Sequence, residues 1–255
     1  EYHYSSLKLY ETLGDKEGID ITLNNIAFIY QEQKDNEKAL EFYNKSLAIT
    51  REIEDVVSEA YVLTNMGDIY VLQKKFEEAL LNYNKSLEIR NTIGDKEGVA
   101  TTYQSIGDLY IFISNTDTAR VYIEKALKIR EEIGDLEGMS YSLNSISKLL
   151  LKNEKYDEAE KLAKRAYELS IKIGFPLNIS STSKLLSIIY EKQGDGLKDL
   201  EMYKLHVEME NKIHNEAIEK SLIKTQTQYE YEKQKTIDDL ENEKQIAIEH
   251  HIAQQ

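Results

Sequence analysis

Apolar residues in this chain form two helical stripes separated by a short polar stretch. The first stripe has the i, i+3, i+4, i+7 spacing of one helix face and consists of Leu23, Ile26, Ala27 and Tyr30. The second stripe consists of Ala39, Leu40, Tyr43, Leu47 and Ile49. The polar residues 32–36 between them are typical of a turn. The pattern therefore predicts two consecutive helices, called A and B below.

The same pair of stripes recurs with a step of forty residues. The positions that keep this step include Tyr30, Tyr70 and Tyr110 in helix A, and Ala39, Ala79, Ala119 and Ala159 in helix B. The segment Gly-Asp-Lys-Glu-Gly at 14–18 also returns at 94–98, and nearly unchanged at 134–138. Gly14 suits the residue just after a helix, and Asp15 suits the N-cap of the next helix. A fixed period built from helix pairs indicates a repeat array.

Small side chains mark where the paired helices meet. One position of helix A holds Ala27, Gly67, Gly107, Ser147 and Ser187. The facing position of helix B holds alanine in four units. A large side chain at either position would push the two helices apart, so we expect close A–B packing in every unit.

These residues carry a family resemblance. Leu23, Ile26, Ala27 and Tyr30, followed by Ala39, Tyr43 and Ser46, resemble the tetratricopeptide repeat, and the next unit matches with Leu63, Met66, Gly67, Tyr70, Ala79, Tyr83 and Ser86. The forty-residue step is similar to the long form found in kinesin light chain and in bacterial sensor proteins. The resemblance implies an all-α fold, a right-handed α-solenoid of antiparallel helix pairs followed by a long C-terminal helix.

The repeat divides the chain into seven segments. They are a B helix of a truncated repeat (1–13), repeat 1 (14–53), repeat 2 (54–93), repeat 3 (94–133), repeat 4 (134–173), a degenerate capping repeat (174–212) and a charged helix (213–255). Asp199 and His206 replace the expected small residues in the fifth unit, and Pro176 fits the first turn of its A helix. We expect the chain to be part of a longer protein.

Residues 213–255 contain no glycine or proline, which favours one long helix. Two heptad registers can be tried, one through Ile237 and Leu240 and one through Leu222 and Tyr229, and both place polar residues at core positions. The segment therefore predicts an interrupted coiled coil and a homodimer through residues 213–255. The alternative is a solvated helix without a partner.

Composition and charge exclude several classes of function. The net charge of −14, without any basic block, argues against nucleic acid as a partner. The absence of cysteine excludes disulfides and thiolate chemistry. No apolar run has the length of a membrane span, and the compartment stays open between bacterial periplasm and cytoplasm.

No residue pattern predicts an active site, metal or cofactor. The Gly-Asp-Lys-Glu-Gly segments lack the Gly-Lys-Ser/Thr ending and the preceding strand of a phosphate loop, so they are better explained as inter-repeat turns. The five histidines, including the pair His250-His251, have no zinc-ligand spacing. The tyrosines at helical spacing are expected in the core, with an aromatic ligand cage as the alternative.

The best binding candidates lie on the face of the A helices that points away from the B helices. In tetratricopeptide arrays this face lines a concave groove. The groove candidates are Asn24, Thr64, Gln104, Asn144 and Lys184 in a first column, Phe28, Asp68, Asp108 and Lys148 in a second, and Gln31 one turn further. Side-chain amides offer a donor and an acceptor to an extended peptide. The alternative is that these residues are only solvated.

The tail adds a second resemblance. Residues 203–208 and 227–233 are similar to the end of sensory tetratricopeptide regions in bacterial signalling proteins, where a charged helix precedes a kinase, a DNA-binding regulator or a cyclase. The resulting hypothesis is a non-catalytic sensor that binds a peptide or protein segment and relays through the C-terminal helix. A passive scaffold without signalling output is the alternative.

Overall fold

The computed structural model describes the backbone of residues 2–253 and the side chains up to residue 236. This part of the chain consists of helices and contains no strand. The helices are α1 (Tyr2–Leu13), α2 (Lys16–Glu32), α3 (Asn36–Glu52), α4 (Val56–Leu72), α5 (Phe76–Ile93), α6 (Lys96–Phe112), α7 (Thr116–Ile133), α8 (Leu136–Lys152), α9 (Tyr156–Ile173), α10 (Pro176–Gln193) and α11 (Gly196–Ala253). The predicted α-solenoid of paired helices with a long C-terminal helix is confirmed.

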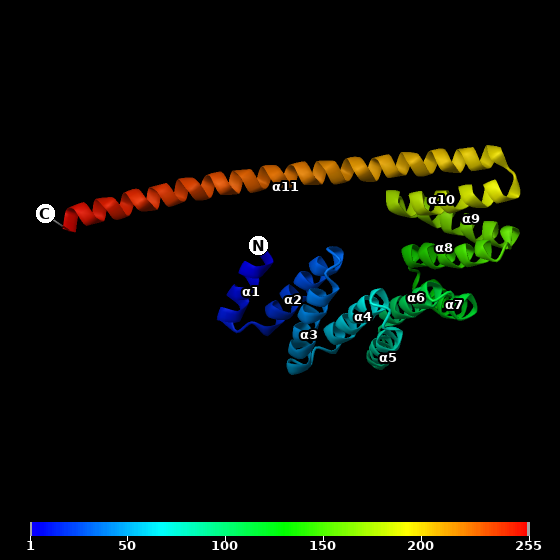
Figure 1. The fold of residues 1–255 in the computed structure, drawn as a ribbon, viewed down its shortest axis with the longest axis horizontal. Helices are drawn as coiled ribbons and strands as arrows, with labels where there is room; N and C mark the ends of the chain where they lie inside the picture. The colour runs from blue at the N-terminus through cyan, green and yellow to red at the C-terminus, as the bar shows by residue number, and fades with distance from the viewer. Residues whose placement is uncertain (1, 254–255) are drawn as a thin grey trace.

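The helix pairs stack into an arc. Each A helix packs on its own B helix and on the B helix of the preceding unit, and α4 also touches α6 as α8 touches α10. Figure 1 shows α5 and α7 on the outer side of the bend and α4 and α6 on its inner side. The even-numbered A helices therefore line the concave face.

The turns between units have the predicted caps. The side chains of Asp15, Asp95 and Asp135 accept hydrogen bonds from the backbone N–H groups of Gly18, Gly98 and Gly138. Gly94 and Gly134 are left-handed, with φ of 73° at both. These conformations satisfy the open ends of two successive helices within a few residues, which sets a tight and repeated turn.

Turns within a unit, between helix A and helix B, use the left-handed conformation without glycine. Lys34, Lys74, Ser114 and Glu154 have φ values of 60° to 62°. Their regular position shows that the repeat imposes this conformation whatever the side chain. The sequence did not signal it, because residues other than glycine and asparagine rarely adopt this region.

Close A–B packing is confirmed at the small positions. Ala27, Ala39, Ala79 and Ala119 are fully buried. A methyl group added to Gly67 would lie 2.4 Å from the ring of Tyr83, and one added to Gly107 would lie 2.5 Å from Ile123. The large side chain of helix B fills the space that the small residue of helix A leaves.

The core runs through the array without interruption. Tyr70 packs against the apolar cluster of α2 to α4 and the cluster of α5 and α6, and Tyr110 packs against the cluster of α5 and α6 and the cluster of α7 to α10. Tyr43 and Tyr83 are almost completely buried. These tyrosines belong to the core, as the helical spacing predicts.

The last repeat and the charged tail form one helix. The expected boundary at residue 213 falls inside α11, which continues without a break from the part that packs on α10. Ser187 donates to Asp199 at 2.6 Å, and Ser180 bonds His206 Nδ1 at 2.9 Å. Asp199 and His206, which replace the small residues of the repeat in the fifth unit, thus both form polar pairs with α10.

From α10 the long helix runs back across the open side of the arc (Figure 1). Near its middle it meets the first helix: Tyr2 Oη donates to Gln228 Oε1 at 3.3 Å, and the rings of Tyr2 and Tyr231 lie 6.2 Å apart, edge to face. The helix therefore connects the two ends of the solenoid.

Other apolar side chains of α11, among them Ile218, Leu222 and Tyr229, are exposed. A homodimer through residues 213–255 stays a prediction, and the side chains of Ile237, Leu240 and the histidine pair lie outside the described residues. Among the helices described, none is long and apolar enough to cross a membrane.

One inter-repeat turn lacks its glycine, and this predicts a stabilising substitution. Glu54 occupies the position of Gly94 with φ 58° and makes no side-chain bond that would justify it. A residue with a Cβ in the left-handed conformation destabilises the folded state by about 1–2 kcal/mol. Glycine removes this strain, but its greater conformational freedom stabilises the unfolded chain by about 0.5–1 kcal/mol. Glu54→Gly should raise the free energy of unfolding by about 1 kcal/mol in urea titration.

The opposite substitution provides the control. In Gly94→Ala the new Cβ meets no atom within 4 Å, so no steric clash adds to the backbone strain and to the changed freedom of the unfolded chain. The substitution should lower the free energy of unfolding by about 1 kcal/mol. If both variants shift the free energy of unfolding in the same direction, the left-handed conformation of the turn does not determine these shifts.

Candidate peptide-binding groove

The first column of groove candidates lies deeper than the spacing suggests. Thr64, Gln104 and Asn144 are only 5%, 4% and 5% exposed, while Asn24 is partly buried and Lys184 is exposed. Thr64 bonds Ser86 at 2.9 Å, and Asn24 donates to Ser46 at 2.8 Å. These side chains hold helix A to helix B, and only their remaining polar atoms can meet a ligand.

The second column carries a pair of partly buried carboxyl groups. Tyr83 donates to Asp68 at 2.6 Å, and Tyr141 donates to Asp108 at 3.2 Å from the neighbouring A helix. Burial raises the pKa of Asp68 to about 6, against the lowering effect of its hydrogen bonds from Tyr83 and Ser105. Burial also raises the pKa of Asp108.

The remaining candidates differ in exposure. Phe28 and Lys148 are exposed, as Lys184 is, so they are available to a partner. Gln31 is partly buried and accepts a hydrogen bond from Tyr43 Oη at 3.1 Å.

Three of the candidates share one cavity of about 650 Å³. Gln104, Asp108 and Asn144 line it together with Tyr141 and Arg130. The cavity lies across the A helices α6, α8 and α10, and its edge includes Leu177 and Ser181 of α10. Lys184 belongs to a different cavity, of about 670 Å³, next to His206 of α11. The structure thus brings together three candidates from the middle of the predicted columns, and Lys184 at the end of the first column lies elsewhere.

Two residues of the cavity were missed from the sequence. Tyr141 lies one turn before the first column, and its ring is about half exposed (51%). Arg130 comes from a B helix, yet it is only 7% exposed and reaches Gln104, Gly138 and Ser142 of two A helices. In the sequence, Arg130 stands out only as an arginine at the end of an apolar stripe, at the position where the first unit has Thr50.

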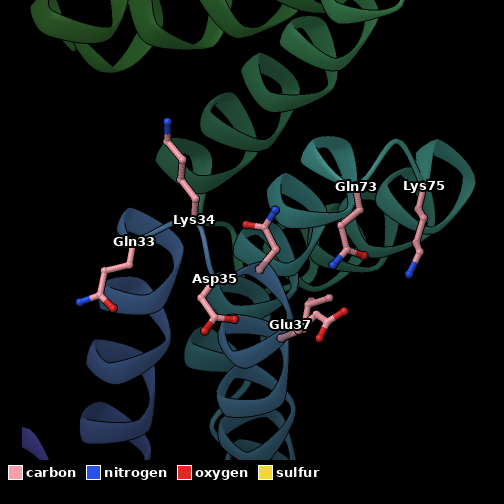
Figure 2. Close-up of a pocket in the computed structure, with 8 residues that line it drawn as sticks. Gln33, Lys34, Asp35, Glu37, Gln73 and Lys75 are labelled. Carbon is pink, nitrogen blue, oxygen red and sulfur yellow. The ribbon is translucent and has the colours of Figure 1, made fainter.

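A hollow at the N-terminal end of the array has a different character. It has a volume of about 910 Å³ and lies at the turns of the first two repeats, between the ends of α2, α3 and α4. Figure 2 shows Gln33, Lys34 and Asp35 pointing away from one another, with Gln73 and Lys75 on the adjacent turn. Because its polar groups do not converge, this hollow is a surface feature of stacked turns.

Among the residues described, no group of histidine and acidic side chains is arranged to hold a metal ion. The groove offers carboxyl groups, amides, hydroxyls and exposed aromatic surface. Such a surface can bind another chain through hydrogen bonds and ion pairs.

Comparisons with known proteins agree with the repeat fold. A family model described as tetratricopeptide repeat matches residues 1–52, 18–92 and 58–132, and a second model with the same description matches residues 140–173. The matches cover more than half of the chain. No curated protein matches it.

Several solved structures have the same fold. BtubC (BKLC) from P. vanneervenii has 18% identity and a TM-score of 0.71, with 84% of this chain and 90% of that chain covered. A STAND protein with a tetratricopeptide repeat sensor from Pyrococcus horikoshii has 20% identity and a TM-score of 0.66, with 86% and 34% covered. Aspartyl phosphate phosphatase F from Bacillus subtilis has 14% identity and a TM-score of 0.69, with 82% and 55% covered.

At these identities the likeness concerns the fold alone. The chain spans about a third of the STAND protein and about half of the phosphatase.

The raised pKa of Asp68 predicts a specific pH dependence of stability. A carboxyl group with a folded-state pKa of about 6, against an ordinary 3.8, stabilises the fold fully below about pH 4 and loses this contribution as the pH rises through 6. Asp68→Asn keeps the acceptor for Tyr83 and removes the buried charge. It should raise the free energy of unfolding at pH 7.5 by about 1–2 kcal/mol and by much less at pH 4.

Urea titrations at the two pH values measure this difference. Glu88→Gln, at an exposed position of α5, provides the control and should change stability equally little at both. An Asp68→Asn effect that is the same at pH 4 and pH 7.5 would contradict the assignment. If the stability of the variant still depends on pH, the remaining dependence comes from groups such as Asp108 and Asp20, because burial raises their pKa values too.

Proposed function

The chain belongs to the tetratricopeptide repeat family, a family of protein-interaction modules, and we propose that it is the ligand-sensing region of a bacterial signalling protein. In this proposal a peptide or protein segment binds in the concave groove. Helix α11 then relays the binding event to an output domain. The family fold is typically a non-catalytic interaction module, so chemistry would belong to such an output domain.

The observation that carries the proposal is the composition of the concave face. Its centre contains a cavity with amide, carboxyl and phenol groups from three successive A helices, and exposed Phe28, Lys148 and Lys184 extend it along the array. An extended chain can use such a face because its backbone groups and side chains meet different repeats.

Relay through α11 is supported by its position. The helix packs on α10 at one end of the arc and touches Tyr2 at the other. An α-helix keeps its length, so a change in the curvature of the arc alters the contact between α1 and α11. One structural neighbour, the STAND protein, is a signal transduction ATPase in which a tetratricopeptide repeat region is the sensor.

The groove can be tested with a random peptide library displayed on phage. We expect the triple variant Phe28→Ser, Lys148→Ser, Lys184→Ser to recover at least about tenfold fewer binding phage than the wild-type chain, a loss of about 1.4 kcal/mol. The control is Leu81→Ser, Val121→Ser, which changes exposed apolar residues of two B helices. Equal recovery by the groove variant and the wild type would refute binding in the groove.

A distance measurement separates the sensor from the passive scaffold. Because the chain has no cysteine, Lys8→Cys and Lys224→Cys place one spin label on α1 and one on α11. A sensor should change this distance by several ångströms when the selected peptides bind, as pulsed electron spin resonance measures. The pair Lys204→Cys and Lys224→Cys, about 30 Å apart on α11, should not change. A constant distance in both pairs would favour the scaffold.

A further inference from the structure

Arg130 is a buried arginine whose Nε has no hydrogen-bond partner. Its Nη1 donates to Gln104 at 3.1 Å, to Gly138 O at 3.0 Å and to Ser142 at 2.7 Å. Its Nε has no hydrogen-bond partner, and the nearest carboxyl oxygen, Asp135 Oδ2, is 3.6 Å away. That distance allows an ion pair but exceeds a hydrogen bond.

The preceding repeat shows the same residue with its donor satisfied. Arg90 occupies the equivalent position, and its Nε donates to Ser86 at 3.0 Å. In the third repeat the counterpart of Ser86 is Ala126, which has no acceptor. The free Nε is therefore specific to the repeat that borders the 650 Å³ cavity.

A free acceptor accompanies this donor. Asn144 is 5% exposed and lines the same cavity, and its Nδ2 donates to Ser181 at 2.9 Å. Its Oδ1 is buried without a partner. A buried polar atom without a hydrogen bond costs about 1–3 kcal/mol, so a ligand that shifts the neighbouring side chains and pairs with both atoms recovers that energy. A peptide bond offers one C=O for Arg130 and one N–H for Asn144.

The charge of the lining selects among peptides. Four acidic residues, Glu97, Asp108, Asp135 and Glu137, line the cavity with one cation, Arg130; with Lys148, which acts on Asp108, two negative charges remain in excess when all are ionised. The half-exposed ring of Tyr141 adds a face on which a cation can lie. At the rim, Leu177 is exposed and can contact the methylene groups of a long side chain.

We propose that this cavity is a specificity pocket for a lysine or arginine side chain of the bound peptide, with the adjacent peptide bond paired to Arg130 Nε and Asn144 Oδ1. The inference rests on the proposed peptide-binding function and adds the identity of the side chain. An acidic or phosphorylated segment would meet the excess negative charge of the lining. A bound metal ion is not supported by the described residues.

The pocket can be tested with four pools of fluorescent heptapeptides. Each pool is randomised except at the central position, which is arginine, lysine, leucine or glutamate. Binding is measured by fluorescence anisotropy with the intact chain. We expect the arginine and lysine pools to bind at least about fivefold more tightly than the glutamate pool at low salt, and the difference to shrink in 1 M salt.

A double variant identifies the pocket. Glu97→Gln, Glu137→Gln removes two exposed charges of the lining and should reduce the advantage of the arginine pool by about fivefold, with little effect on the leucine pool. The matched control is Glu77→Gln, Glu78→Gln, which removes two exposed charges of α5 and should leave the advantage intact.

The outcomes separate the two proposals. Binding of all pools without a preference for arginine or lysine overturns the pocket and leaves the peptide groove standing. A preference that the double variant and the control reduce equally also overturns the pocket, because it then reflects the overall charge of the chain. If no pool binds, the peptide groove itself fails and the pocket fails with it.

Discussion

The structure depends on the fact that one helix pair cannot bury its own apolar surface. Helix A and helix B meet closely because small residues such as Ala39 or Gly67 allow it, but each pair still needs the next one to cover its outer faces. Tyr70 and Tyr110 show this dependence, since each packs against two of the apolar clusters. Stability, curvature and the continuous inner surface all follow from this nearest-neighbour packing.

The same constraint places polar groups where a ligand can use them. Successive A helices are held close together on the inner side of the bend, so a side chain of one repeat reaches a partner in the next, as Tyr141 reaches Asp108. Burial of such groups is tolerated when hydrogen bonds satisfy them. Two of the buried atoms left unsatisfied in the described part of the chain, Arg130 Nε and Asn144 Oδ1, lie where three repeats and a B helix converge.

The fold could be predicted from the sequence because each repeat shows the same pattern of apolar and small residues. Gly94 and Gly134 marked the turns, and the alanine column marked the helix contacts. Less of the site could be predicted. A forty-residue step shows which residues share a column, but it does not show how far each helix is rotated about its own axis. That rotation buries Gln104 and leaves Tyr141 half exposed. The role of Arg130 depended on side chains from two neighbouring helices, and the continuity of α11 depended on packing against α10.

The contact between Tyr2 and α11 turns an open arc into a closed ring. A chain with a free end can thread through a ring, whereas a loop of a folded partner can enter only from the side, after the ring has opened. The closure consists of one hydrogen bond and one edge-to-face ring pair near the surface, together worth about 1–2 kcal/mol. A free-energy difference of that size corresponds to a ratio of about ten to one between two states. In the proposed function, a ligand that gains a comparable free energy from the open arc would suffice to open this ring.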